Sequence, residues 1–358
     1  MNKKKFDNLL TIAVQEGATD IILAVGEPPM VRYGDALIDL KQRFLEAIDT
    51  ELIARLLLKH KYEQLTSFTA AEVAYEIEDI ARFRASVFKQ RGVFRIVLRV
   101  IPVEIRNFAD LHLPGELVDI ATLKRGLVLV TGATGQGKST TMSAIIEQIN
   151  RTRKAHIITI EDPIEFTYQK ARSIITQREI GEDVIDYQGA LRQALRQSPD
   201  VIMAGEIRDA ETFEAVLTSA ETGHLTLSAI HTTDAERTFN RILSFYTEAE
   251  RQSVRERLAN NLSAIISLRL LPCQQGGLRI PAIEILRMNG TIADCLRHHE
   301  KMPEITKHMA KSRDYYGMRT FDQDILTLYH SGLIDIGTAI NSATNPTDLE
   351  RAISFVSH

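Results

Sequence analysis

The chain has 358 residues and a formal net charge of −4, with 44% of its residues hydrophobic and 25% charged. This composition is typical of a globular protein and lacks the basic excess of a duplex-DNA-binding protein. No apolar run approaches the roughly 20 residues of a membrane-spanning helix, and two cysteines, Cys273 and Cys295, make neither a disulfide framework nor a four-cysteine zinc site. We therefore expect a cytoplasmic protein with no membrane insertion and no nucleic-acid partner.

The first part of the chain, residues 1–103, predicts a small α+β domain. A chain of this length usually exceeds what one hydrophobic core organises, so two domains are expected. Residues 82–89 and 93–100 have strand patterns on either side of a turn. Gly92 supplies the turn geometry, so these two segments are predicted to form a hairpin.

A linker and a larger second domain are expected to follow. Residues 104–115 form the predicted linker, because Pro102 and Pro114 stand among polar residues and proline restricts both its own backbone and that of the preceding residue. Residues 116–289 form the predicted main domain. Residues 290–358 have a helical pattern of variable polarity and predict a helical C-terminal region.

Four short apolar runs in the main domain predict a parallel sheet. Helix-period segments such as 187–197 and 210–221 separate most of them, and continuous apolar strands between helices are typical of a sheet covered on both faces. The runs are residues 126–130, 156–160, 201–204 and 225–230. Ligands of such sheets bind beyond the carboxyl ends of the strands. A glycine-rich loop, Glu161, Glu206 and His231 follow the four runs in that order, so we expect them to lie together.

The glycine-rich loop matches the P-loop pattern G-x-x-x-x-G-K-[ST] and stands between a strand and a helix that is predicted to begin near Lys138. Its glycines let backbone N–H groups turn inward around an anion, and the helix N-terminus adds partial positive charge. Lys138 is predicted to reach the β and γ phosphates of ATP, and Ser139 to ligate Mg²⁺. The predicted nucleotide-binding residues of this segment are Gly132, Ala133, Thr134, Gly135, Gln136, Gly137, Lys138, Ser139 and Thr140.

Two acidic side chains are predicted to complete the chemistry. Glu206 ends a Walker B type strand and is expected beside the P-loop, where it would accept a proton from the attacking water or align it. The alternative role, capping the next helix, suits Asp209 better. Glu161 is predicted to hold Mg²⁺ through water, because this ion keeps much of its hydration shell. Asp162 has the alternative of bonding backbone before Pro163.

Two histidines flank the fourth apolar run. His231 is predicted to hydrogen-bond the γ-phosphate and report its loss, because an imidazole both donates and accepts. His224 is a second catalytic candidate, with a structural role after the Gly223 turn as the alternative. Neither is expected to bind zinc, since further ligands at suitable spacing are missing.

Arginines crowd the predicted hairpin of the first domain. A ring ATPase commonly needs a positive side chain from elsewhere to stabilise the transferring phosphoryl group, and arginine is planar and always charged. Arg84 and Arg99 are therefore predicted to contact nucleotide. A solvated strand face is the alternative for each of the five arginines, which are Arg82, Arg84, Arg91, Arg95 and Arg99.

With these motifs together, the sequence resembles the PilT/PilU group of type IV pilus retraction ATPases in the secretion ATPase superfamily. The resemblance covers nearly the whole chain and includes the P-loop and the hairpin from Arg82. Its other motifs are residues 17–20, 26–29, 159–166, 176–181, 198–206 and 221–232.

The resemblance implies a PAS-like first domain, a RecA-like second domain and a homohexamer at the cytoplasmic base of the pilus machine, at the inner membrane. In that family ATP turnover changes the angle between domains and withdraws pilin, which powers pilus retraction and twitching motility. The implied partners are an inner-membrane platform protein of the pilus and a paralogous PilT-type ATPase.

Two segments favour the PilU-like branch, whose members assist a PilT motor. Residues 291–297 stand where PilT proteins carry an Ala-Ile-Arg-Asn type motif, while residues 318–323 and Ala133 resemble PilU. One alternative is a PilB/GspE-like assembly or secretion ATPase, although those proteins usually have a longer N-terminal region and a zinc insertion. The other is a low-turnover regulatory ring subunit, against which the intact Lys138 and Glu206 argue.

Overall fold

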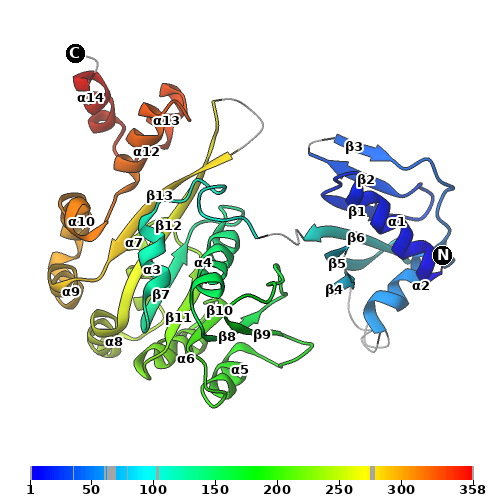
Figure 1. Ribbon diagram of the computed structural model, residues 1–358, viewed down its shortest axis with the longest axis horizontal. Helices are drawn as coiled ribbons and strands as arrows, with labels where there is room; N and C mark the ends of the chain where they lie inside the picture. The colour runs from blue at the N-terminus through cyan, green and yellow to red at the C-terminus, as the bar shows by residue number, and fades with distance from the viewer. Residues whose placement is uncertain are drawn as a thin grey trace. The chain divides into compact units, whose positions relative to one another are not determined.

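The computed structural model describes residues 2–34, 36–59, 62, 70–78, 80–101, 105–274 and 279–356. The chain divides into two compact units, Met1–Glu104 with Pro163–Thr167 and Ile105–Asp162 with Tyr168–His358. Figure 1 shows the elements of both units. The predicted domain boundary at residue 103 lies outside the described residues.

The first unit is an antiparallel sheet with two helices, which confirms the expected α+β class. Its described strands form a six-stranded sheet in the order β3-β2-β1-β6-β5-β4. The elements are α1 (Lys3–Gln15), β1 (Asp20–Leu23), β2 (Met30–Tyr33), β3 (Ala36–Asp39), α2 (Ala47–Leu58), β4 (Ala70–Ile77), β5 (Ala81–Gln90) and β6 (Val93–Ile101). Strands β5 and β6 are the predicted hairpin, with Gln90 opposite Val93.

Buried and more exposed side chains alternate along this hairpin, so its two faces differ. Phe83 and Leu98 are buried in a core that also contains Phe6 of α1 and Ile53 of α2. Because successive side chains of a strand point to opposite faces, the arginines between the buried positions share the other face. The core therefore holds the apolar face, and the arginine-rich face is left for polar contacts.

The second unit is built on a mainly parallel sheet, as the sequence predicts. In the described residues the sheet has seven strands in the order β13-β12-β7-β11-β10-β8-β9, and β13 runs antiparallel to β12. The strands are β7 (Gly126–Thr131), β8 (His156–Glu161), β9 (Ile174–Glu179), β10 (Val201–Glu206), β11 (Leu225–Ile230), β12 (Leu262–Pro272) and β13 (Arg279–Arg287). The four predicted strands form its centre, and β9, β12 and β13 extend it.

Helices cover both faces of this sheet (Figure 1). One buried cluster joins α3 and α4 to the sheet, and another joins α5 to α8 to the opposite side. These helices are α3 (Glu116–Thr122), α4 (Lys138–Thr152), α5 (Tyr187–Ala194), α6 (Ala210–Glu221), α7 (Ala235–Leu243) and α8 (Glu248–Asn261). The double covering explains why the central strands are continuously apolar.

The C-terminal region is helical, as predicted, and is drawn in orange and red in Figure 1. Its elements are α9 (Gly290–Arg297), η2 (His299–Glu304), α10 (Ile305–Lys311), α11 (Arg313–Tyr316), α12 (Phe321–His330), α13 (Ile336–Ser342) and α14 (Pro346–Val356). Helices α12 to α14 bury apolar side chains against β12 and β13. Among the described helices none combines the length and apolarity needed to cross a bilayer.

Candidate active site

The P-loop connects the end of β7 to the start of α4, as expected. Gly137 has φ 89° and is the N-cap of α4, where a side chain would be strained. A Cβ at Gly132 would lie 3.0 Å from the carbonyl oxygen of Leu268, so this backbone approach also requires glycine. Among the described residues, no side chain caps the N-terminus of α4. Its first-turn amides therefore suit an anion, which is the fit that a nucleotide phosphate requires.

Lys138 projects its ammonium into the loop. The side chain is buried, with 8% exposure, and Nζ donates to the carbonyl oxygens of Gly132 at 2.9 Å and Ala133 at 3.0 Å. Nζ also lies 3.3 Å from Nδ1 of His231. The lysine thus places a positive charge inside the loop and connects the loop to the end of β11.

Glu206 ends β10, which is not the strand next to the P-loop strand. Strand β11 pairs with β7 on one side and β10 on the other, so it separates the two. His231 follows β11 and crosses this separation, with Nε2 2.7 Å from Oε2 of Glu206. The three side chains form a continuous series, Lys138 to His231 to Glu206.

The hydrogen bonds define the tautomer of His231. A lysine ammonium can only donate, so Nδ1 accepts from Lys138. Nε2 then carries the proton and donates it to the carboxylate of Glu206. This arrangement belongs to a neutral imidazole that contacts the lysine with one ring nitrogen and the acid with the other.

A bulge in β10 directs Glu206 toward the histidine. The pairing of β10 with β11 shifts register between Ala204 and Glu206, with Gly205 as the extra residue. Burial opposes ionisation of Glu206, but hydrogen bonds from His231 and Arg208 outweigh it and hold its pKa below the usual value. Glu206 is therefore a charged acceptor near neutral pH, which suits it to align a water molecule.

Glu161 ends β8, the other neighbour of β10. It is buried, and its Oε1 accepts from Thr159 Oγ1 at 2.6 Å and Gln177 Nε2 at 3.2 Å. Ser139, the second residue of α4, is partly exposed. In the described ranges no group of three or more His, Cys, Asp or Glu side chains could hold a metal by itself. A Mg²⁺ ion would therefore depend on Ser139, phosphate oxygens and water.

Two residues near Glu206 were not predicted from the sequence. Arg208 forms an ion pair with Glu206 and stands only two positions after it, so the spacing could have indicated it. The phenol of Tyr187 lies against Gly205, where an added Cβ would be 2.5 Å from its oxygen. Burial and the nearby carboxylates of Asp162 and Glu206 raise the pKa of this phenol. No local pattern marks Tyr187, which reaches the site only through packing of α5.

His224 lies away from this site. It precedes β11 whereas His231 follows it, and a six-residue strand separates them by roughly 20 Å. Its Nδ1 lies 3.1 Å from both Thr222 Oγ1 and the carbonyl oxygen of Ser219. These contacts match the structural alternative, and the structure does not bring His224 to the P-loop.

The arginines of the first unit have partners within that unit. Arg84 Nε donates to Glu72 at 3.0 Å, and Arg99 Nε donates to Asp20 at 3.0 Å. The side chain of Arg99 is nevertheless 73% exposed. Their contact with nucleotide stays a prediction.

A cavity of about 300 Å³ opens beside the P-loop. Gln136, Gly137 and Thr140 contribute to its wall, together with apolar residues of the segment after the first unit and of β12. The apolar members of the lining are Leu111, Leu113, Leu268, Leu270, Ile280, Pro281 and Leu333. A mostly apolar cavity next to a phosphate-binding loop suits the base and ribose of a nucleotide.

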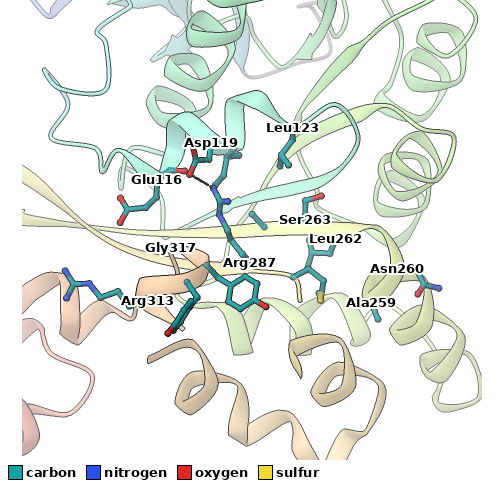
Figure 2. A pocket seen from close by; sticks show the side chains of 15 residues that line it. Glu116, Asp119, Leu123, Ala259, Asn260, Leu262, Ser263, Arg287, Arg313 and Gly317 are labelled. Carbon is teal, nitrogen blue, oxygen red and sulfur yellow. Dashed lines mark hydrogen bonds and ion pairs between the residues drawn. The ribbon is translucent and has the colours of Figure 1, made fainter. Parts of the chain in front are cut away.

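The chain also has a larger cavity of about 760 Å³, and Figure 2 shows the side chains that line it. It is lined by α3, the end of α8, the start of β12 and α11. Arg287 lies within it, donates to the carbonyl oxygen of Glu116 at 2.9 Å and is 3.7 Å from Asp119. The larger cavity therefore lies at the amino end of β12. The P-loop is at the carboxyl end of β7, so the larger cavity does not mark the nucleotide site.

The fold and the site together define a P-loop ATPase with a RecA-like sheet. The Type II/IV secretion system protein family matches residues 3–323. The type IV pilus ATPase PilU of Pseudomonas aeruginosa is 36% identical, over 98% of this chain and 92% of its own. The type IV pilus retraction ATPase PilT of the same organism is 35% identical, over 94% and 98%.

Among solved structures, the pilus retraction motor PilT with bound ADP has a TM-score of 0.88 and 39% identity, covering 96% of this chain and 98% of that one. The chain belongs to the Type II/IV secretion system protein family. It is an ATPase of the pilus retraction group and binds nucleotide, which confirms the resemblance stated from its motifs.

Proposed function

We propose that this chain is one subunit of a homohexameric motor that hydrolyses ATP to power type IV pilus retraction and twitching motility. The series Lys138, His231 and Glu206 carries the proposal, because it joins the phosphate-binding loop to a carboxylate that can act on water. The near full-length similarity to retraction ATPases supports the same activity.

In the proposed mechanism the P-loop amides and Lys138 bind the β and γ phosphates, and the cavity beside Gln136 receives the nucleoside. Mg²⁺, held by Ser139 and through water by Glu161, would neutralise charge on the phosphates. Glu206 aligns the attacking water or accepts its proton. Arg208 holds Oε1 of Glu206, the carboxylate oxygen that His231 does not contact.

His231 reports the state of the γ-phosphate through its two contacts. Phosphate binding draws Lys138 away from the carbonyl oxygens of Gly132 and Ala133, which changes the contact at Nδ1 of His231. Movement of the ring then alters its bond to Glu206. The residues after β11, 231–234, therefore form the sensor segment that connects hydrolysis to the rest of the unit.

The ring supplies the remaining positive charge. Arg84 or Arg99 of a neighbouring subunit would stabilise the transferring phosphoryl group, as an arginine finger does. Doping a Glu206→Gln subunit into wild-type rings tests this assembly. If turnover falls more steeply than the fraction of wild-type subunits, the result supports subunits that act on one another. A fall in proportion to that fraction contradicts the proposed assembly.

We place the motor at the cytoplasmic side of the inner membrane, acting with the pilus platform protein and, as a PilU-like subunit, with a PilT-type ATPase. Residues 318–323 support the PilU-like assignment. Deleting the gene and scoring pili and motility tests the direction of the motor. Excess pili with lost twitching supports retraction, and absent pili would instead indicate an assembly ATPase.

A further inference from the structure

A buried carboxylate lies outside the residues assigned so far. Glu284 of β13 is 6% exposed, and its Oε1 accepts from the backbone N–H of Ala235 at 2.9 Å and from Ser267 Oγ at 3.3 Å. Among the contacts found in the described part of the chain, Glu284 has no ion pair. An ionised carboxylate buried without a paired cation is unfavourable, so its presence calls for a reason beyond packing.

The bond to Ala235 anchors the sensor segment. Ala235 is the first residue of α7, directly after Asp234, which caps the helix. The hydroxyl of Thr232 lies 2.7 Å from that of Thr238 in the first turn of α7. The sensor segment is thus bonded to the start of α7, and Glu284 fixes that start to the sheet.

The second bond connects Glu284 to β12, the strand next to the P-loop strand. Ser267 pairs with Glu284 on one side and with Thr131 on the other. Thr131 directly precedes the P-loop and pairs with Ile230, the residue before His231. One row of paired residues therefore crosses four strands, from the buried carboxylate to the residues that precede the P-loop and His231.

We propose that Glu284 is a positioning residue for ATP hydrolysis: its ionised carboxylate holds the sensor segment in register with the P-loop, and its protonation weakens that hold. The inference rests on the proposed role of His231. A charged acceptor makes a stronger hydrogen bond with a backbone N–H than a neutral acid does. Protonation therefore loosens the start of α7 and, with it, the placement of His231.

A cavity of about 510 Å³ borders Glu284 and gives protons a route to it. The charged groups that line this cavity with Glu284 are Asp234, Glu236, Arg237, Arg269 and Asp322. Burial raises the pKa of Glu284, and the nearby Asp234 raises it further. The backbone N–H of Ala235, the charge of Arg269 and the hydroxyl of Ser267 lower it, and the net effect is a rise to about 7. The carboxylate can therefore change charge under physiological conditions.

Glu284→Gln tests the inference in the purified full-length protein, because glutamine keeps the size and the acceptor oxygen but cannot ionise. We expect wild-type kcat to rise with pH through a midpoint set by Glu284, and kcat of the variant to be low and flat over about pH 6 to 8.5 with KM for ATP unchanged. The melting temperature of the variant at pH 8 should equal or exceed the wild-type value, because the cost of the buried charge is gone. A purely structural glutamate would instead lower it.

Ser267→Ala supplies an independent measurement. It removes one donor to the carboxylate, so the pKa of Glu284 should rise and the midpoint of the kcat profile should move to higher pH with the alkaline plateau kept. A wild-type profile in Glu284→Gln, or an unmoved midpoint in Ser267→Ala, overturns the inference. Should Glu284→Gln not fold, the Ser267→Ala midpoint decides. Lys138→Ala in the same assay separates the two proposals: if hydrolysis requires Lys138 while Glu284→Gln behaves as wild type, only the positioning role fails.

Discussion

The imidazole Nε2 of His231 lies 2.7 Å from Oε2 of Glu206, across the boundary between β11 and β10. The other ring nitrogen faces Lys138, so one side chain contacts both the phosphate-binding loop and the acid. A neutral histidine in this position can transmit a change at the lysine to the carboxylate. The predictions below follow from this connection and from the backbone that supports it.

Replacing His231 should disable catalysis more than binding. We expect His231→Ala to lower kcat by about 10²-fold or more, the usual scale for loss of a group in acid–base catalysis, with little change in nucleotide affinity. The double variant with Glu206→Gln should be hardly slower than the slower single variant, because the two side chains act as a unit. Steady-state kinetics of the three variants measure this. A double variant in which the two single losses of kcat multiply would contradict it.

The other histidine of the same strand tests the placement of the site. His224→Ala should leave kcat close to wild type, because His224 lies at the far end of β11 and contacts Thr222 and Ser219 there. A loss comparable to that of His231→Ala would instead support the catalytic role that the sequence predicted for His224.

Loss of Lys138 should weaken nucleotide binding. Lys138→Ala removes the charge inside the P-loop together with the bonds to the carbonyl oxygens of Gly132 and Ala133, so both affinity and loop geometry suffer. We expect ATP affinity to fall at least about tenfold, which corresponds to about 1.4 kcal/mol. Calorimetric titration measures it, with the exposed Lys154→Ala as the matched control. Equal affinities of the two variants would contradict the assignment.

The pH dependence of turnover should depend on Arg208. Its hydrogen bond, with that of His231, holds the pKa of Glu206 below its usual value, so the activity that remains below the step assigned to Glu284 should have an acidic limb set by Glu206. Arg208→Gln weakens this effect, the pKa of Glu206 rises, and the acidic limb of the kcat profile should shift to higher pH. Arg151→Gln is the control, because the exposed side chain of Arg151 pairs with Glu147 near the end of α4, away from Glu206. An unshifted acidic limb in Arg208→Gln would show that Glu206 does not control it.

The bulge at Gly205 should tolerate no side chain while Tyr187 keeps its hydroxyl. A Cβ at this position would lie 2.5 Å from that oxygen, so Gly205→Ala should cost about 1–3 kcal/mol of stability and lower kcat. Adding Tyr187→Phe removes the clashing atom and should restore much of the lost stability and of the lost kcat. Gly290→Ala meets nothing within 4 Å and should change stability by at most about 0.5 kcal/mol. Denaturant unfolding measures all of these, and failure of Tyr187→Phe to rescue would locate the strain elsewhere.

Some features of this protein followed from the sequence alone. The P-loop, the start of α4 at Lys138 and the run of β11 were predictable because glycine geometry, helix capping and continuous apolar strands act over a few neighbouring residues. The same local rules placed Glu206 and His231 at strand ends. The polar edge strand β9 escaped this reasoning, because a strand at the edge of a sheet need not be apolar.

Only the tertiary structure decided how these pieces meet. Strand order is set by packing between segments far apart in the chain, so the sequence could not show that β11 lies between β7 and β10 or that His231 thereby joins Lys138 to Glu206. The contact of Tyr187 with Gly205 and the anchoring of α7 by Glu284 depend in the same way on long-range burial. Local backbone chemistry determined which groups this protein uses, and the packing of its sheet determined which of them touch.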